Sequence, residues 1–493
     1  MIYFVRIYPM KISHDDIGKI LSRFNPWWRN EGIPDLPAWH RAPFREFFSW
    51  VSSPPVHRAV LLTGARQIGK TTLMLQAVKA LLEKGIPPSN ILYATFDHPL
   101  LKMAGADDVL EVWREREVLS GGPEFLFLDE AQFIRDWGTW IKHQVDFQKN
   151  RHIVFTGSAM PLAEANQESG VGRWHTIRLG TLSFYEYTKL RKLDLSPLPE
   201  IRSLTELLSW PATEFQKISE MVISYTPHFH EYLVRGGFPQ TAQVESIDQA
   251  QKILREDIVD KVLKRDMTAL FGVRHILDLE QTFLYLCMHD GGLLDMVSLC
   301  ANLEVKRPTA QHFIEILEAA NLIYRLPPLG YGKEILRGRF KIYLADAAIA
   351  SAVLLKGKSV IDDPTSLGIA AETATFKHIF GRVYEQSLRF SYWRGKRDQE
   401  VDLVAEMGHT LIPFEVKYRA DHTGARELQG FYEFLKQKGG THGYVVTKSP
   451  GDFGMANGPP GVKAQVLKIP APLLCYWLGE SEIGQGIDAV STI

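Results

Sequence analysis

The fold of this chain is decided by the stretch Leu61-Leu62-Thr63-Gly64-Ala65-Arg66-Gln67-Ile68-Gly69-Lys70-Thr71-Thr72. An apolar strand runs into GxxxxGK[ST], the pattern of a P-loop, and an apolar-periodic helix follows. The two glycines let the backbone turn tightly with its N–H groups pointing inward, so the loop and the helix N-terminus can bind phosphate oxygens. We therefore expect a nucleoside triphosphate to be bound by Gly64, Ala65, Arg66, Gln67, Ile68, Gly69, Lys70, Thr71 and Thr72.

The acidic groups that hydrolysis needs are expected in Phe125-Leu126-Phe127-Leu128-Asp129-Glu130. Four consecutive apolar residues are typical of a strand buried on both faces of a parallel sheet, and the two acids would stand at its carboxyl end, beside the phosphates. Asp129 would hold Mg²⁺ together with Thr71, while Lys70 would reach the β- and γ-phosphates. Glu130 is the candidate base that polarises the attacking water, because phosphoryl transfer depends mostly on positioning and charge stabilisation.

Two further residues are candidates for the same site. A third strand, 152–156, ends just before Ser158, whose hydroxyl would sense the γ-phosphate or orient the water, or would instead cap the next helix. Arg173 precedes another short strand, 175–179, and would neutralise transition-state charge in the same or a neighbouring subunit, or would instead be a surface arginine. Action in a neighbouring subunit would require at least a homo-oligomer of two chains.

These residues also carry a family resemblance. It rests on the P-loop and on Asn25-Pro26-Trp27-Trp28, Ile91-Leu92-Tyr93, Leu128-Asp129-Glu130-Ala131-Gln132, Thr156-Gly157-Ser158, Gly172-Arg173, Leu182-Ser183-Phe184-Tyr185-Glu186, Gly236-Gly237-Phe238-Pro239, Lys341-Ile342-Tyr343-Leu344-Ala345-Asp346 and Glu400-Val401-Asp402. Over nearly its whole length the chain resembles a prokaryotic AAA+-type ATPase family, whose members typically carry a carboxy-terminal domain of unassigned function. The resemblance implies an ATPase that uses ATP and Mg²⁺, and its later stretches are less specific than the ATPase motifs.

The bulk composition limits the possible classes of protein. With 493 residues the chain is too long for one ordinary core, so several domains are expected. A formal net charge of −1 excludes a globally basic nucleic-acid binder but leaves room for a local basic face. The three cysteines form no CxxC pair, which fits a reducing cytoplasm, and no apolar segment is long enough to span a membrane.

Three helices followed by a hairpin are predicted between residues 276 and 344. The expected elements are 279–288, 293–301, 308–320, 322–326 and 340–344. That order indicates a winged helix, and Pro308 suits the first turn of its third helix. The residues that would face DNA are Lys306, Arg307, Thr309, Gln311 and His312 on this helix and Lys333, Arg337 and Arg339 on the wing. Winged helices also dock proteins, so a protein partner is the alternative to DNA.

The last part of the chain contains a possible nuclease site. The stretches 400–404 and 412–417 predict two strands of a hairpin around residues 407–409. Alternation puts Glu415 and Lys417 on one face, so that two carboxylates and an ammonium converge if Asp402 lies opposite. Asp402 and Glu415 could then bind Mg²⁺, while Lys417 supports a hydroxide that attacks a phosphodiester. Glu372, on an expected helix 370–380, would add a third carboxylate.

This arrangement resembles the PD-(D/E)xK nuclease core, with Gln429 on the next helix as an accessory candidate. Val401 replaces the proline of that name. The alternative is a nuclease-like fold whose site is inactive or serves only for binding.

We therefore expect an α/β protein that combines a P-loop AAA+-type parallel-sheet core and helical lid with a winged-helix domain and a PD-(D/E)xK-like α/β domain. The predicted parts are a helical lead-in (1–56), the ATPase core (57–190), the lid or linker (191–272), the winged helix (273–345) and the nuclease-like domain (346–493). The expected function is ATP hydrolysis coupled to action on DNA. The rival hypotheses are a nucleotide-gated switch that docks a protein, and an ATP-licensed nuclease.

Overall fold

The computed structural model describes residues 12–33, 36–117, 120–157, 172–268, 273, 275–330, 339–381, 390–396, 399–419, 424 and 426–484. The chain divides into two compact units, and each is described by itself. One comprises the chain to Gly64 together with Gly69–Ile177, and the other comprises Ala65–Ile68 and the chain from Arg178. Among the helices in these ranges, none is long and apolar enough to cross a membrane.

A five-stranded sheet with the order β2-β3-β4-β1-β5 forms the centre of the first unit. Its strands are β1 (Ala59–Thr63), β2 (Ile91–Thr95), β3 (Glu124–Asp129), β4 (Arg151–Gly157) and β5 (Trp174–Arg178). The pairs β1–β4, β2–β3 and β3–β4 are parallel, as the buried apolar runs predicted. Because β4 separates β1 from β3, the P-loop and Asp129 lie on either side of the carboxyl end of β4.

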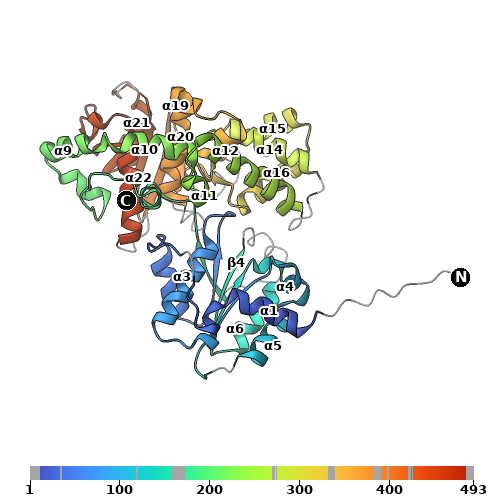
Figure 1. Ribbon diagram of the computed structural model, residues 1–493. Helices are drawn as coiled ribbons and strands as arrows, with labels where there is room; N and C mark the ends of the chain where they lie inside the picture. The colour runs from blue at the N-terminus through green and yellow to red at the C-terminus, as the bar shows by residue number, and fades with distance from the viewer. Residues whose placement is uncertain are drawn as a thin grey trace. The chain divides into compact units, whose positions relative to one another are not determined.

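Helices cover both faces of this sheet (Figure 1). They are α1 (His14–Phe24), α2 (Phe44–Ser52), α3 (Lys70–Glu83), α4 (Pro99–Ala104), α5 (Ala106–Arg116) and α6 (Trp137–Phe147), with 3-10 turns η1 (Pro26–Arg29), η2 (Pro88–Asn90) and η3 (Ala131–Phe133). One core joins α1, α5 and α6 to alternate strand residues such as Leu126, Leu128 and Phe155, while α2 packs on α3. The alternation follows from the two-residue period of a strand.

The Asn25-Pro26-Trp27-Trp28 stretch closes the exposed edge of β2. The buried Asn25 amide donates to the carbonyl of Tyr93 at 2.8 Å and accepts from the Tyr93 N–H at 2.7 Å. The indole N–H groups of Trp27 and Trp28 both donate to the carbonyl of Ile91, at 3.1 and 3.0 Å. These side chains therefore satisfy edge-strand backbone groups that a sixth strand would otherwise pair.

The second unit begins with a series of helices that precede residue 276. They are α8 (Phe184–Arg191), η4 (Leu204–Ser209), α9 (Ala212–Val222), α10 (Tyr225–Arg235), α11 (Pro239–Gln243), α12 (Ile247–Arg255) and the π-helical η5 (Glu256–Asp266). The segment 191–272, which we predicted as a helical lid or linker, contains helices in its described residues. We assigned residues up to 190 to the predicted ATPase core, but helix α8 packs on α11 and on α22 (Ala471–Gly484), within the second unit.

The elements predicted between 276 and 344 are present in the predicted order. They are α14 (Ile276–Met288), α15 (Met296–Leu303), α16 (Arg307–Ala319), β6 (Ile323–Leu326) and β7 (Lys341–Leu344), and β6 and β7 pair antiparallel. The predicted start of α15 at Leu293 is wrong, because the Asp295 carboxylate caps this helix by accepting from the N–H groups of Val297 and Ser298. Leu293 instead forms a bridge with Lys341.

A six-stranded sheet with the order β12-β13-β11-β10-β9-β8 forms the last sheet of the second unit. Its strands are β8 (Phe390–Arg394), β9 (Glu400–Met407), β10 (Thr410–Lys417), β11 (His442–Thr447), β12 (Gly454–Ala456) and β13 (Gln465–Pro470), with helices α18 (Ala348–Val353), α19 (Ser359–Asp362), α20 (Pro364–Phe380) and α21 (Gln429–Lys438) and the turn η7 (Pro450–Asp452). Strands β9 and β10 form the predicted hairpin, in which Met407 pairs with Thr410. Helix α21 packs on β9 and β10, and α22 on β11 and β13.

A buried ion pair and its hydrogen bonds join four stretches of this unit that are distant in the sequence. The ammonium of Lys377 donates to a carboxylate oxygen of Asp346 at 3.1 Å and to the carbonyl of Leu182 at 2.8 Å. The same Asp346 oxygen accepts from the hydroxyl of Thr181 at 2.7 Å and from the N–H of Gly237 at 3.0 Å. A Cβ on Gly237 would lie 2.5 Å from the Leu182 carbonyl, so only glycine fits there.

We predict that Asn25→Ala destabilises the first unit. It removes the buried amide bonds to the Leu21 carbonyl and to both backbone groups of Tyr93, at a cost of about 3 kcal/mol in the free energy of unfolding. Trp28→Phe is the matched control, because the Ile91 carbonyl keeps its bond from Trp27, and it should cost about 1 kcal/mol. Urea unfolding measures both, and equal stability of the two variants would contradict the edge-strand role of Asn25.

Candidate functional site

The P-loop connects the carboxyl end of β1 to the first turn of α3. Gly64 and Gly69 have φ values of 146° and 97°, which favour glycine, and Gln67 between them also has a positive φ of 60°. Lys70 is the first residue of α3, and its side chain is buried and donates to the Gly64 carbonyl at 2.9 Å. The positive end of α3 and the Lys70 ammonium therefore face the same loop, as an anion site requires.

The carboxylate of Asp129 accepts hydrogen bonds from three hydroxyl groups. Thr71, in the first turn of α3, donates to one oxygen at 2.6 Å, and Tyr93 on β2 donates to the same oxygen at 2.9 Å. Thr156, near the end of β4, donates to the other oxygen. A hydroxyl and a carboxylate this close beside a P-loop are ligands that fit Mg²⁺. Burial, and then the charge of Asp129, raise the pKa of Tyr93, so its hydroxyl stays protonated and can donate.

Glu130 follows Asp129 in a left-handed conformation, with a φ of 52°. Its N–H donates to the Thr156 hydroxyl at 2.9 Å, and its carboxylate accepts from the amide of Gln132. A positive φ in a residue other than glycine is uncommon and persists where the surroundings hold it. Thr156 thus links both acids, since it accepts from the backbone of Glu130 and donates to Asp129.

Two other residues, Ser158 and Arg173, were predicted for this site. Ser158 lies outside the described residues. Arg173 lies beside Ala59, at the opposite end of β1 from the P-loop, and pairs with Asp146 at 3.4 Å. Since β1 has five residues, it spans about 16 Å. The prediction that Arg173 acts in the same chain therefore finds no support in this geometry, and its action in a neighbouring subunit stays a prediction.

Sequence reasoning missed Tyr93 and Thr156 as partners of Asp129. Both lie on strands that flank β3 in the sheet, two residues and one residue before the ends of β2 and β4. The signal that could have found them is a hydroxyl near the carboxyl end of each apolar strand, read together with the strand order. The order of the strands in the sheet cannot be read from the sequence of a single strand.

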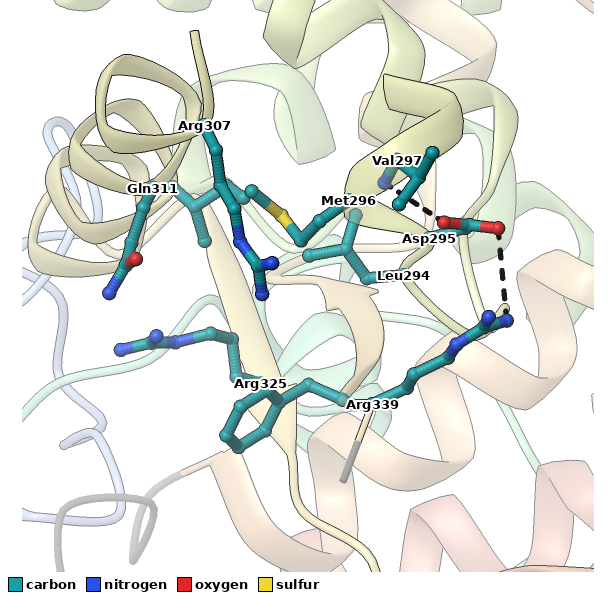
Figure 2. Close-up of a pocket in the computed structure, with 10 residues that line it drawn as sticks. Leu294, Asp295, Met296, Val297, Arg307, Gln311, Arg325 and Arg339 are labelled. Atoms are coloured by element: carbon teal, nitrogen blue, oxygen red, sulfur yellow. Dashed lines mark hydrogen bonds and ion pairs between the residues drawn. The ribbon is translucent and has the colours of Figure 1, made fainter. Parts of the chain in front are cut away.

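In the second unit, exposed polar side chains lie around the N-terminus of α16. Lys306, Arg307, Gln311 and His312 are exposed, while Thr309 is half-buried, and Pro308 lies in the first turn as predicted. Beside them is a hollow of about 530 Å³. Figure 2 shows Arg307 and Gln311 projecting toward Arg325, with Arg339 turned toward Asp295. The predicted wing residues Lys333 and Arg337 lie outside the described residues.

Carboxylates also lie together on the C-terminal sheet. Asp402 on β9 accepts from the N–H of Val416, and Glu415 on β10 accepts from the N–H of Asp402 and from the Lys417 ammonium. Glu372, on α20, accepts from the Tyr343 hydroxyl at 2.8 Å. The side chains of Asp402, Glu415 and Lys417 thus meet as predicted, whereas Gln429 is exposed at the start of α21 and hydrogen-bonds none of them.

Sequence reasoning missed a second lysine in this cluster. Lys341 on β7 is buried, and its ammonium donates to Asp402 at 3.2 Å and pairs with Glu400. Burial raises the pKa of Glu372 and of Glu415, each to about 8. Burial also opposes the charge on Asp402, but Lys341 and Lys417 outweigh it and hold the pKa of Asp402 below its usual range. The two ammonium groups therefore already neutralise carboxylate charge in this cluster.

Comparison with protein families divides the chain into three matched segments. Residues 56–188 match the model of an AAA domain, so this segment is an AAA-type P-loop domain, as its motifs predicted. Residues 226–359 match "Domain of unknown function (DUF8612)", and residues 367–471 match "Domain of unknown function (DUF4143)".

Similar proteins are found in bacteria and archaea. An uncharacterized protein of Haemophilus influenzae is 23% identical over 73% of this chain and 82% of its own length. An uncharacterized protein of Methanocaldococcus jannaschii is 27% identical over 69% of this chain and 72% of its own. Among solved structures, the Walker-type ATPase of Pyrococcus abyssi is 15% identical with a TM-score of 0.35, covering 63% of this chain and 94% of that one. The Aeropyrum pernix ORC1 protein in complex with DNA is 12% identical with a TM-score of 0.28, covering 65% and 94%.

We predict that the Thr156 hydroxyl stabilises the first unit. Thr156→Val leaves the Glu130 N–H and one Asp129 oxygen without this partner, which should lower the free energy of unfolding by about 1–3 kcal/mol. Thr156→Ser keeps the hydroxyl and is the matched control. Urea unfolding compares the two variants, and a Val variant as stable as the Ser variant would show that this hydroxyl bridge is dispensable.

Proposed function

We propose that this chain binds ATP with Mg²⁺ and hydrolyses it in the AAA domain. The observation that carries the proposal is the hydroxyl of Thr71 placed 2.6 Å from the Asp129 carboxylate, one residue after the buried Lys70. Thr71 and Asp129 would hold Mg²⁺, directly or through water, beside the phosphates. When bound, the ion neutralises charge on the phosphate oxygens.

The remaining steps belong to side chains of this chain. Lys70 binds the β- and γ-phosphate oxygens and stabilises their negative charge. Glu130 orients a water and accepts its proton as the water oxygen bonds to the γ-phosphorus. The bond from that phosphorus to its bridging oxygen breaks, so ADP keeps the oxygen and inorganic phosphate leaves. The fixed backbone of Glu130, held through Thr156, supports this assignment.

We further propose that ATP hydrolysis serves action on DNA, through the exposed start of α16. The three helices and the hairpin in winged-helix order support this, since such domains place their third helix in the major groove. Arg307 makes no hydrogen bond or ion pair with any residue that the structure describes, so its guanidinium is available for a phosphate. The overall charge of −1 then requires a local contact rather than a general attraction.

The rival function is a nucleotide-gated switch that docks a protein partner. Lys341 in the acidic cluster favours the part of this hypothesis in which the nuclease-like fold is inactive, because a cation of the protein lies on Asp402. A protein partner captured only with ATP, and no response to DNA, would support it. Oligomers that bring Arg173 to a neighbouring P-loop, and a location in the cytoplasm, are compatible with either function and remain proposals.

Two variants separate binding from hydrolysis. Lys70→Ala should weaken ATP binding about 100-fold, because a charged contact to phosphate is worth up to about 3 kcal/mol. Glu130→Gln should bind ATP as the wild type does but hydrolyse it about 10²- to 10⁴-fold more slowly, since it cannot accept a proton. Fluorescent-nucleotide binding and phosphate release measure the two effects. Turnover at the wild-type rate by both variants would rule out the assigned site.

The DNA contact can be tested on the surface of α16. The triple change of Lys306, Arg307 and Gln311 to Ala should weaken DNA binding and reduce the slope of log K against log salt by about 2, because two phosphate contacts are lost. Lys436→Ala with Lys438→Ala, at the exposed end of α21, removes the same positive charge and is the matched control. Equal affinity and salt slope in both variants would argue against α16 as the DNA-binding helix.

A further inference from the structure

The resemblance to PD-(D/E)xK nucleases implies a divalent cation between Asp402 and Glu415, and the structure offers a test of that fit. One Asp402 oxygen accepts from the Lys341 ammonium at 3.2 Å, and the other accepts from the Val416 N–H at 3.1 Å. One Glu415 oxygen accepts from Lys417, and the other accepts from the Asp402 N–H at 3.2 Å. All four carboxylate oxygens therefore already have protein donors.

A divalent cation does not fit this arrangement. Mg²⁺ requires oxygen ligands at about 2.1 Å in an octahedron, and a lysine ammonium bound to the same carboxylate would repel it. Within the described ranges no group of three or more acidic, histidine or cysteine side chains is arranged to hold a metal. The Lys341 side chain has only 4% of its surface exposed, so its ammonium is buried together with Asp402.

Two of the donors to these carboxylates, the Lys341 ammonium and the Tyr343 hydroxyl, come from the β6–β7 hairpin, outside the C-terminal sheet. Lys341 and Tyr343 are two residues apart on β7, so both side chains point to the same face. Lys341 binds Asp402 and Glu400, and Tyr343 donates to Glu372 at 2.8 Å. A backbone contact is added after the end of β6, where the Leu329 N–H donates at 2.7 Å to the carbonyl of Tyr392 on β8.

We infer that Lys341 is an intramolecular counter-cation that occupies a latent divalent-cation site formed by Glu372, Asp402 and Glu415. With β7 in this position the site holds no Mg²⁺ and cleaves no phosphodiester, and the ionic contact instead fastens the β6–β7 hairpin to the C-terminal sheet. The inference rests on the proposed nuclease-like fold and is independent of ATP hydrolysis.

The test uses Mn²⁺ as the probe and the full chain without nucleotide. The loss of the free Mn²⁺ signal in electron paramagnetic resonance measures binding. The wild type should bind no Mn²⁺ at this cluster, so its isotherm should equal that of Asp402→Asn. Lys341→Met, which keeps the length of the side chain and removes the charge, should gain one bound Mn²⁺ per chain and a higher melting temperature with Mn²⁺. The added change Asp402→Asn should abolish both gains.

Two matched controls complete the experiment. Lys341→Arg keeps the positive charge and should bind no Mn²⁺, and Lys358→Met, at an exposed lysine, should behave as the wild type. Mn²⁺ binding by the wild type that is lost in Asp402→Asn would overturn the inference, and this comparison decides the question even if Lys341→Met does not fold. A folded Lys341→Met variant without bound Mn²⁺ would overturn it as well. Phosphate release from ATP, measured on the same samples, reports separately on the proposed ATPase.

Discussion

The carboxylate of Asp129 holds together three elements of the first unit at one point. Hydroxyl groups from α3, β2 and β4 donate to its two oxygens, so the P-loop helix, the edge strand and the central strand are all fixed relative to β3. The constraint extends outward, because Asn25 fixes the backbone of Tyr93 and Thr156 fixes the backbone of Glu130. A buried carboxylate is costly without such donors, so these contacts depend on one another. Preorganised acids are what phosphoryl transfer requires.

In the second unit, buried ion pairs join segments that are distant in the sequence. Lys377 and Asp346 form a fully buried pair, to which the stretches around Leu182 and Gly237 contribute a carbonyl and an N–H. Such a pair gives little net stability relative to an apolar contact, but removing either partner leaves an uncompensated charge, so it selects one arrangement of these segments. Lys341 acts in the same way between β7 and β9. Lys377 and Lys341 thus each join segments that are distant in the sequence.

The sequence predicted those features that depend on neighbouring residues. The P-loop, the buried strand before Asp129 and the hairpin around Gly408 follow local patterns, and the structure contains all three. Contacts between strands were not predictable in this way, because the hydroxyl of Tyr93 reaches Asp129 only once the strand order β2-β3-β4 is known. Lys341 is 61 residues from Asp402, and nothing in its local pattern distinguishes it from a strand residue at a surface. The position of Arg173 beside Ala59 gives no support to a role in the same chain, and its residue type alone says nothing about which end of the sheet it occupies.

We propose that ATP hydrolysis in the AAA domain serves action on DNA. The measurement that tests it most directly is the rate of ATP hydrolysis by the unmodified protein with Mg²⁺, alone and with single-stranded, double-stranded or branched DNA. We expect hydrolysis in the absence of DNA and a clear stimulation by one of these forms, which would identify the substrate class. Absence of hydrolysis under every condition would contradict the ATPase, and hydrolysis indifferent to all three forms would contradict its action on DNA.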